Sequence, residues 1–285
     1  MTRRHAIFFI NPTRTEAISA ARELAKLLIA QNFSLSTTSD IDIDGIEKVS
    51  IANLPSAEVV VVLGGDGTIL RGAEVARLLD TPLLGINLGN VGFMAEVERP
   101  SLLTMAMSIA SSSYITEKRA VLAYSVMRED IEVTQGWALN EVTVERDGTT
   151  MVELFVQIDQ RPLSRWGCDG LICATPTGST AYAFSAGGPI LWPEVDALVL
   201  LPISAHALFA RPMVISPSSE IIVGIESKGA LLSADALRKF SLQLGDRVVI
   251  TKDSTVIKLA HVQATLFTDR LVAKFKLPIE GWRGE

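Results

Sequence analysis

The sequence of 285 residues is long enough to bury a substantial core, in one large domain or in two medium ones. Hydrophobic residues make up 48% of it and charged residues 20%, which is typical of a globular protein and excludes a disordered or fibrous one. The formal net charge of −6 argues against nucleic-acid and membrane partners. An anionic ligand would therefore be held by local backbone amides and a few placed cations.

Cysteine and histidine usage indicates a reducing compartment and gives no zinc-site spacing. Cys168 and Cys173 have neither the number nor the spacing for a disulfide framework or a zinc site, and the three histidines are scattered, so no metal-ligating residues are assigned. The apolar run at 6–10 ends at Asn11-Pro12 and is too short for a secretory signal. No stretch approaches the ~20 apolar residues of a membrane-spanning helix. We expect a cytoplasmic protein.

The first 120 residues, taken as one domain, alternate between strand-like and helix-like segments. Residues 6–10 form a compact apolar run, and residues 58–63, with four consecutive valines, are the most strand-like segment of the chain. Helical spacing follows each of them, over 16–30 and 68–79, and residues 82–87 suit a further strand. This alternation predicts an α/β domain with a parallel, Rossmann-like sheet.

Residues 121–267 have a different sequence pattern, which predicts a second, β-rich and β-sandwich-like domain. The expected strands are short, rich in β-branched residues and separated by turns, at 123–127, 138–144, 152–158, 221–225 and 247–251. The helical candidate is 179–186. Residues 268–285 are compatible with a return to the first domain.

The segment Gly64-Gly65-Asp66-Gly67-Thr68 joins the valine-rich strand to a helix, at the sheet edge where α/β proteins place ligands. Glycines permit positive φ and let backbone N–H groups approach a phosphate, and the helix N-terminus adds partial positive charge. We therefore expect Gly64, Gly65, Gly67 and Thr68 to bind phosphate. Neither a Walker A loop nor a GxGxxG fingerprint is present.

Asp66 is the unusual residue of this turn. A carboxylate among glycines would repel a resting phosphate, so it suits the acceptance of a hydroxyl proton better than passive anion binding. The alternative is that Asp66 caps the following helix. Arg71, one turn into that helix, could contact a substrate phosphate or be a solvated charge.

Later segments offer further polar groups. Asn140-Glu141 suits vicinal ribose hydroxyls, but consecutive strand residues face opposite sides unless the strand ends or bulges there. An exposed polar pair is the alternative. The turn at 176–180 begins a helix and carries Ser and Thr for capping, and Asp169-Gly170 is compatible with a simple turn.

In this order the motifs resemble the NAD kinase family: GGDGT at 64–68, Asn140-Glu141, Asp169-Gly170, and TPTGSTAY at 175–182. The GGDG turn alone is shared with phosphofructokinases and with diacylglycerol and sphingosine kinases, whereas the combination is far more specific. The resemblance implies transfer of the terminal phosphoryl group of ATP, or of polyphosphate, to the adenosine 2′-hydroxyl of NAD, giving NADP.

The resemblance also implies roles for individual residues, with Asp66 as the catalytic base. The implied NAD-binding residues are Asp66, Gly67, Arg71, Asn140, Glu141, Asp169, Thr180, Ala181, Tyr182, Ala183, Phe184 and Ser185. Asp235 matches a later aspartate but is a weaker candidate, because Ala236-Leu237 replaces more polar neighbours. Gly167 stands where many members have Arg or Lys. Family members usually require Mg²⁺ and form dimers or tetramers, so a homo-oligomer is expected.

Two alternatives remain from the residues alone. A lipid or sugar kinase would share only the GGDG turn, and a lipid kinase would expose an apolar entrance. A non-catalytic dinucleotide sensor would bind NAD without forming NADP, although Asp66 inside the glycines argues against it.

Overall fold

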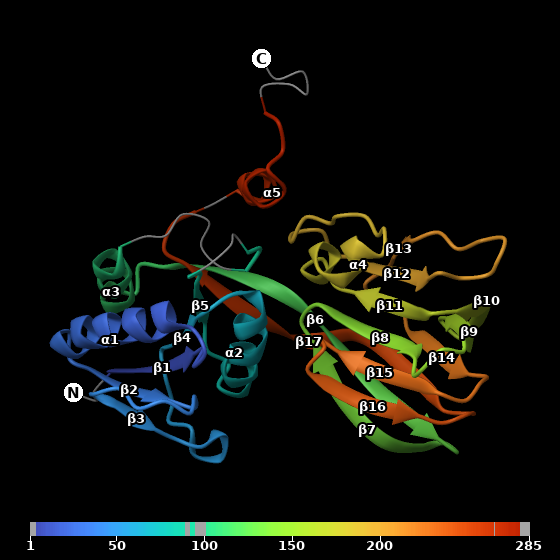
Figure 1. Ribbon diagram of the computed structural model, residues 1–285, viewed down its shortest axis with the longest axis horizontal. Coiled ribbons are helices and arrows are strands. Elements are labelled where there is room, and N and C mark those ends of the chain that lie inside the picture. Colours follow the sequence, from blue (N-terminus) through green and yellow to red (C-terminus); the bar gives the residue numbers. More distant parts are fainter. Residues whose placement is uncertain (1–3, 89–91, 95–100, 265, 280–285) are drawn as a thin grey trace. The chain divides into compact units, whose positions relative to one another are not determined.

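The computed structural model describes residues 4–88, 92–94, 101–264 and 266–279. The chain divides into two compact units, residues 1–118 with 257–285 and residues 119–256. Figure 1 labels the helices and strands of both. Two long strands, β6 (Ile115–Arg128) and β17 (Arg247–His261), contribute residues to both units.

The first unit is built on a parallel sheet. Its strands are β1 (Arg4–Ile10), β2 (Phe33–Thr37), β3 (Ile46–Lys48), β4 (Val59–Leu63) and β5 (Leu83–Ile86). They lie in the order β5-β4-β1-β2-β3 with every pair parallel, and the end of β17 adds to β5 in parallel. The helices are α1 (Thr15–Ala30), α2 (Asp66–Leu78), α3 (Leu102–Ser111), α5 (Phe267–Phe275) and the 3-10 helix η1 (Ile51–Asn53). The prediction of an α/β parallel-sheet domain is confirmed.

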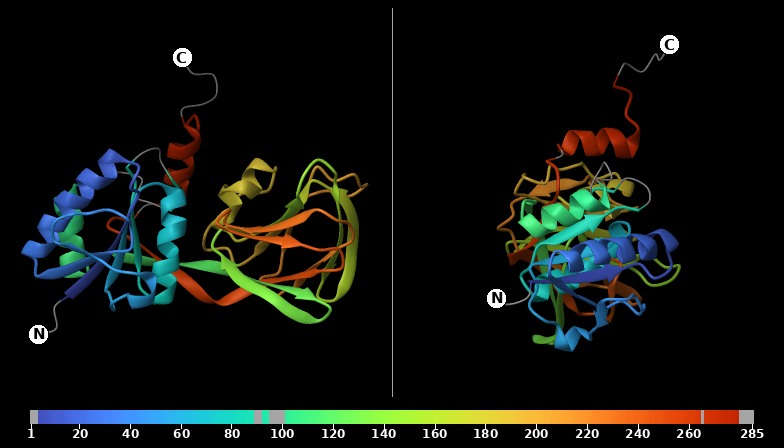
Figure 2. Two further views of the ribbon diagram at one scale, coloured as in Figure 1. Left: turned by 60° about the horizontal axis from the view of Figure 1, so that its bottom comes forward. Right: turned by 90° about the vertical axis from the view of Figure 1, so that its left-hand side faces the viewer.

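Helices cover both faces of this sheet, which explains the uninterrupted valine run. Val59, Val61 and Leu63 of β4 share a core cluster with α1 and α3. Val62 instead faces α2, where it lies so close to Gly72 that a Cβ there would overlap it. The left view of Figure 2 shows α1 (blue) and α3 (green) on one side of the strands and α2 (teal) on the other. Since β4 is buried on both faces, its sequence does not alternate.

The second unit consists of antiparallel strands around one shared core, as the β-sandwich-like prediction requires. One set contains β6, β7 (Ile131–Ala138), β9 (Val152–Ile158), β10 (Arg161–Cys168), β14 (Ile221–Ile225) and the first part of β17. The other contains β8 (Glu141–Arg146), β11 (Gly170–Ala174), β12 (Leu198–Ile203), β13 (Met213–Ile215), β15 (Ala230–Ala234) and β16 (Arg238–Leu242). Alternate residues of both sets, such as Val142 and Leu154, pack around the fully buried Trp166.

Residues 138–144 are not the single strand expected from the sequence. The backbone N–H groups of Leu139 and Asn140 donate to the Asp235 carboxylate, at 2.8 and 2.7 Å, and not to a neighbouring strand. The ladder is thereby interrupted, and β7 ends at Ala138 while β8 begins at Glu141.

Residues 179–186 are likewise not one continuous helix. They form the 3-10 helix η2 (Gly178–Thr180) and the short helix α4 (Tyr182–Ser185), separated at Ala181. The Ser179 hydroxyl donates to the carbonyl of Pro176 at 2.6 Å and accepts from the N–H of Leu191 at 2.9 Å. Such side-chain bonds to the backbone compete with helix continuation.

Candidate active site

The phosphate turn of the first unit begins where the buried strand β4 ends. Gly65 is the N-cap of α2, and Asp66 is the first residue of the helix. None of the three glycines has a positive φ. The expectation that the turn uses the left-handed backbone conformation open to glycine is therefore wrong. A Cβ at Gly64 would overlap the Thr68 side chain, whereas a Cβ at Gly65 or Gly67 would meet nothing within 4 Å. The turn therefore needs glycine for close packing at one position and leaves open space at two others.

The Asp66 carboxylate is fixed by one oxygen only. Oδ2 accepts a hydrogen bond from the backbone N–H of Phe93 at 3.2 Å. Oδ1 is buried and finds no hydrogen-bond partner among the described residues. A Cβ on Gly92 would lie closer than 3.0 Å to this carboxylate, so only glycine fits beside it. Leaving such an acceptor unpaired costs about 1 to 3 kcal/mol, which a ligand hydroxyl would recover.

Asp66 is not the helix cap. The N-cap residue is Gly65, no side chain caps α2, and the Asp66 carboxylate bonds to Phe93. The capping interpretation is therefore wrong for this carboxylate. Of the other residues expected here, Thr68 is nearly buried and Arg71 is exposed one turn along α2.

In the second unit, Asn140 and Glu141 lie where β8 begins. Because the strand starts at Glu141, the two neighbours are not held to opposite faces, which meets the condition for binding one ligand. Asp235 accepts from the N–H of Asn140 and donates its own N–H to the Glu141 carbonyl at 3.0 Å. Asn140 Oδ1 and Glu141 Oε2 are buried and have no hydrogen-bond partner among the described residues. Two acceptors are thus presented by residues that are themselves rigidly held.

Glu141 and Asp235 form a buried acidic pair. Burial raises the pKa of the Glu141 carboxyl to about 8, and the charge of Asp235 acts in the same direction. Burial also raises the pKa of Asp235, to about 6, although the N–H groups of Leu139, Asn140 and Glu141 oppose this. Burial therefore favours the protonated form of both carboxyls, and more strongly that of Glu141.

The turn before α4 packs directly against Asn140. A Cβ on Gly178 would overlap the Asn140 carbonyl, so the backbones meet without a side chain between them. The Thr175 hydroxyl donates to the Leu139 carbonyl at 2.6 Å and accepts from the N–H of Gly178 at 3.1 Å. Thr175 and Gly178 were not among the expected site residues. Both lie in the TPTGSTAY motif at 175–182, from which only residues 180–182 were assigned to NAD.

A pocket of about 310 Å³ adjoins Glu141 on the same sheet. The Tyr182 hydroxyl donates to Glu145 Oε2 at 3.2 Å, and Thr143 donates to the other oxygen at 2.6 Å. Arg146 holds Asp169 through an ion pair of 2.7 Å. Sequence reasoning missed Thr143, Glu145 and Arg146. Thr143 and Glu145 alternate with Glu141 along β8, and this spacing is the signal that could have found those two. The pocket is lined by Glu141, Thr143, Glu145, Arg146, Tyr182, Leu231, Ser233, Ala236 and Lys239.

The expected residues around α4 divide by exposure. Tyr182, Phe184 and Ser185 are exposed, and Thr180 and Ala181 are half-buried. Ala183 is fully buried and packs with Ile172, Val199 and neighbouring side chains, so it supports the helix from beneath.

The phosphate turn of the first unit and the site residues of the second unit lie in segments that match known protein families. Residues 6–111 match the ATP-NAD kinase N-terminal domain, and residues 139–262 match the ATP-NAD kinase C-terminal domain. The chain is 43% identical to NAD kinase 2 of Streptomyces avermitilis, with 99% of this chain and 98% of the relative covered. It is 41% identical to the NAD kinase of Mycolicibacterium paratuberculosis, again over 99% and 98%.

The chain belongs to the NAD kinase family. This family phosphorylates NAD to NADP with ATP, and the chain is one of its enzymes.

Two solved structures share the NAD kinase fold. Yeast NADH kinase complexed with NADH superposes with a TM-score of 0.85 at 24% identity, covering 99% of this chain and 89% of that one. An NAD kinase from Archaeoglobus fulgidus in complex with ATP gives 0.70 at 24% identity, covering 96% and 99%.

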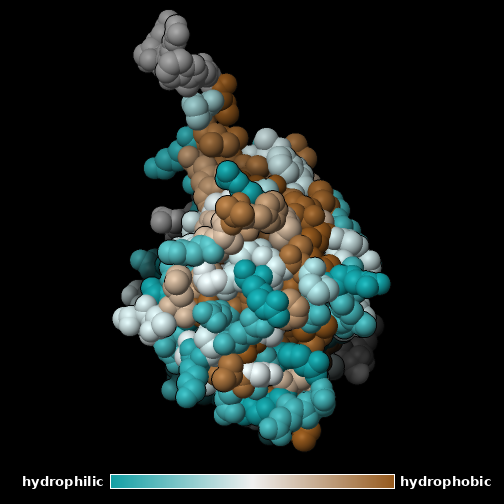
Figure 3. Space-filling view, turned by 90° about the vertical axis from the view of Figure 1, so that its right-hand side faces the viewer, coloured by the Kyte–Doolittle hydropathy of each residue, from teal (hydrophilic) through white to brown (hydrophobic). Residues whose placement is uncertain are grey.

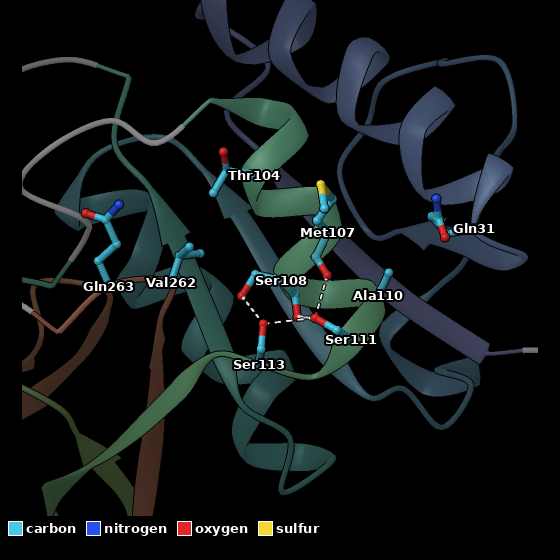
Figure 4. A pocket seen from close by; sticks show the side chains of 9 residues that line it. All are labelled: Gln31, Thr104, Met107, Ser108, Ala110, Ser111, Ser113, Val262 and Gln263. Atoms are coloured by element: carbon cyan, nitrogen blue, oxygen red, sulfur yellow. Dashed lines mark hydrogen bonds between the residues drawn. The ribbon is translucent and has the colours of Figure 1, made fainter.

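A second pocket, of about 740 Å³, contains none of the residues that the NAD kinase motifs supply (Figure 4). In it the hydroxyls of Ser108 and Ser111 both bond to that of Ser113, at 3.2 and 2.9 Å, and Ser111 also donates to the Met107 carbonyl. None of its described lining residues carries a charge. The lining residues are Gln31, Thr104, Met107, Ser108, Ala110, Ser111, Ser113, Val262 and Gln263.

Proposed function

We propose that the chain transfers the terminal phosphoryl group of ATP to the adenosine 2′-hydroxyl of NAD, with Asp66 as the general base. The observation that carries this proposal is the Asp66 carboxylate, which is anchored at Oδ2, does not cap its helix, and keeps a buried Oδ1 without a partner among the described residues. That oxygen is suited to accept the hydroxyl proton as the 2′ oxygen attacks phosphorus and the donor diphosphate leaves.

The turn that carries Asp66 suits the donor's phosphates. Gly65 and Gly67 leave open space beside the N-terminus of α2, where backbone amides and the helix dipole favour negative charge. Thr68 and Arg71 follow on the same helix. Neutralising the transferred group and aligning it with the hydroxyl supply most of the acceleration expected for phosphoryl transfer.

In this proposal Asn140 and Glu141 bind the ribose hydroxyls of NAD. Their buried oxygens without a described partner would each accept one hydrogen bond from the sugar. The protonated Glu141 can in addition donate one. Asp169, Thr180, Ala181, Tyr182, Phe184 and Ser185 remain the proposed contacts of the NAD molecule. The buried Ala183 would support them from the core, and Asp235 would act through the backbone of Asn140.

We also propose that the reaction uses Mg²⁺ and takes its phosphoryl group from ATP or polyphosphate. Among the described residues no group of three or more His, Cys, Asp or Glu side chains could hold a metal ion. The one carboxylate of the turn, Asp66, is the proposed base, so a Mg²⁺ would be held mainly by phosphate oxygens and water. When bound, Mg²⁺ would neutralise the phosphates of ATP or, as an alternative donor, of polyphosphate. Comparing NADP formation with each donor, with and without Mg²⁺, tests this choice.

A homo-oligomer is proposed from the exposed apolar side chains of the second unit. Leu208 and Phe209, between β12 and β13, and Val214 of β13 are all more than half exposed. Figure 3 draws one face of the molecule, where hydrophobic residues form patches among hydrophilic ones. Light scattering measures the oligomeric state, and a monomer at working concentration would contradict this proposal.

A cytoplasmic location is also proposed. Cys168 and Cys173 are free and buried, and burial raises their thiol pKa values to about 11 and 12. Thiols held protonated in this way suit a reducing compartment. No helix among the described residues is long and apolar enough to cross a membrane. Fractionation of the native cells measures the location, and enrichment outside the cytoplasm would contradict it.

The decisive variant is Asp66→Asn. Asn preserves size but cannot take up a proton, so kcat should fall by roughly 10²- to 10⁴-fold while the Kd for NAD changes much less. The matched control is Asp44→Asn, an exposed carboxylate of the same unit, which should keep wild-type kcat.

The rival functions give different results in the same assay. A dinucleotide sensor would bind NAD and form no NADP even in the wild-type protein. A lipid kinase would phosphorylate diacylglycerol in preference to NAD. Retention of more than about a tenth of the wild-type kcat by Asp66→Asn would remove the base assignment, because general-base loss exceeds that.

A further inference from the structure

The C-terminal helix α5 holds the segment that anchors Asp66. The ring of Phe93 packs against those of Phe267 and Phe275 on α5, with centroid separations of 5.9 and 5.8 Å. Phe93 itself is 6% exposed. The residue whose N–H fixes Asp66 is therefore seated on a helix that begins 174 positions later in the sequence.

Both polar groups of Phe93 are used. Its N–H donates to Asp66 Oδ2 at 3.2 Å, and its carbonyl accepts from Nη1 of Arg270 at 2.7 Å. Arg270 is 3% exposed, so its guanidinium is a buried charge on the inner face of α5. Two hydrogen bonds, one on either side of the Phe93 Cα, thus connect Arg270 to Phe93 and Phe93 to the carboxylate.

Arg270 also contacts His261, the last residue of β17. Its Nη2 lies 3.3 and 3.4 Å from the two ring nitrogens of His261, whose Nε2 is 3.4 Å from Glu117. The His261 ring thus contacts both the Arg270 guanidinium and the Glu117 carboxylate.

We infer that Arg270 is a positioning residue for the catalytic step. It acts on Asp66 through Phe93, and the inference rests on the proposed role of Asp66 as base. A charge-assisted bond to the Phe93 carbonyl fixes that residue, and the Phe93 N–H in turn fixes Asp66 Oδ2. The carboxylate is thereby turned so that Oδ2 is occupied and Oδ1 keeps no hydrogen-bond partner among the described residues. A loosely held carboxylate would lose this geometry, and small misplacements cost catalysis heavily.

The test compares Arg270→Lys and Arg270→Gln with the control Lys274→Gln, which removes an exposed cation from the same helix. Both Arg270 variants should lose roughly 10- to 100-fold in kcat while the Kd for NAD changes less than about twofold, since the geometry is needed only in the transition state. Arg270→Lys should retain more activity than Arg270→Gln, because it keeps the charge. Lys274→Gln should match the wild-type protein.

A double-mutant cycle separates positioning from general destabilisation. In the Asp66→Asn background, Arg270→Lys should lower kcat less than about twofold, because the group that it positions is gone. Equal losses in both backgrounds would overturn the inference and make Arg270 a structural residue. Wild-type kcat in Arg270→Lys and Arg270→Gln, with Asp66→Asn inactive, would overturn it while leaving the proposed function intact.

Gly92→Ala reaches the same carboxylate without touching α5, and it serves if the Arg270 variants do not fold. A Cβ at this position overlaps Asp66, so kcat should fall at least 10-fold with NAD binding retained. Full activity of Gly92→Ala would overturn the inference, since the carboxylate would then tolerate displacement.

Discussion

At the scale of single residues, the acidic pair of Glu141 and Asp235 makes the stability of the second unit depend on pH. The folded-state pKa of Glu141, about 8, is higher than the 4.5 of the free carboxyl. The folded state therefore binds this proton more tightly than the unfolded state does. Its contribution to stability is fully present below pH 4.5 and is lost as the pH rises through 8.

Glu141→Gln should remove this loss of stability at high pH. The free energy of unfolding of the variant, measured by urea denaturation, should exceed that of the wild-type protein by an amount on the order of a few kcal/mol at pH 9 and by much less at pH 5. The exposed Glu132, changed to Gln, is the control and should give no pH-dependent difference. A constant difference between Glu141→Gln and wild type across this range would contradict the buried proton.

At the scale of elements, the interruption between β7 and β8 is what presents Asn140. The carboxylate of Asp235 replaces a strand as the acceptor for two backbone N–H groups, and Gly178 lets the next turn pack on the Asn140 carbonyl. The site on this unit is thus built from three segments that hold one another in place.

Gly178→Ala should therefore damage both folding and recognition. A Cβ there meets backbone and not a flexible side chain, so the turn must move away from Asn140. We expect a loss of about 1 to 3 kcal/mol in the free energy of unfolding, as for other overpacked sites, together with a Kd for NAD raised at least 10-fold. Gly224→Ala, whose Cβ would make ordinary contacts at 3.6 Å, is the control. Unchanged NAD affinity in Gly178→Ala would show that this contact does not shape the site.

The same elements show how far the sequence predicts the structure. Local patterns were sufficient for β4 and α1, because periodicity and burial are properties of neighbouring residues. Residues 138–144 and 179–186 were predicted as single elements because their interruptions arise from Asp235, which is distant in sequence, and from side chains that bond to backbone. The motifs predicted Asp66 and Asn140-Glu141 as candidates. They gave no indication of the bond between Arg270 and Phe93, which are 177 positions apart.

At the scale of the whole molecule, long strands connect the two units. β17 pairs with β14 in its first part and with β5 at its end, so one continuous strand of 15 residues supplies both units. The chain returns to the first unit along this strand, at residue 257. That return brings His261 and α5 to the unit that carries Asp66.

The net charge of −6 leads to a prediction about the product. A protein that is negative overall must bind anionic ligands through groups placed for them, and in the proposed reaction the site has to accommodate the new 2′-phosphate at the end of every turnover. NADP should therefore compete with NAD, raising its apparent KM without changing kcat. NADP should not itself be phosphorylated, because the acceptor oxygen is already esterified. Assays with labelled ATP measure both, with NAD as the positive control. Label transferred to NADP at a rate close to that for NAD would show that another hydroxyl is the acceptor, and absence of competition would show that the product leaves by a different site.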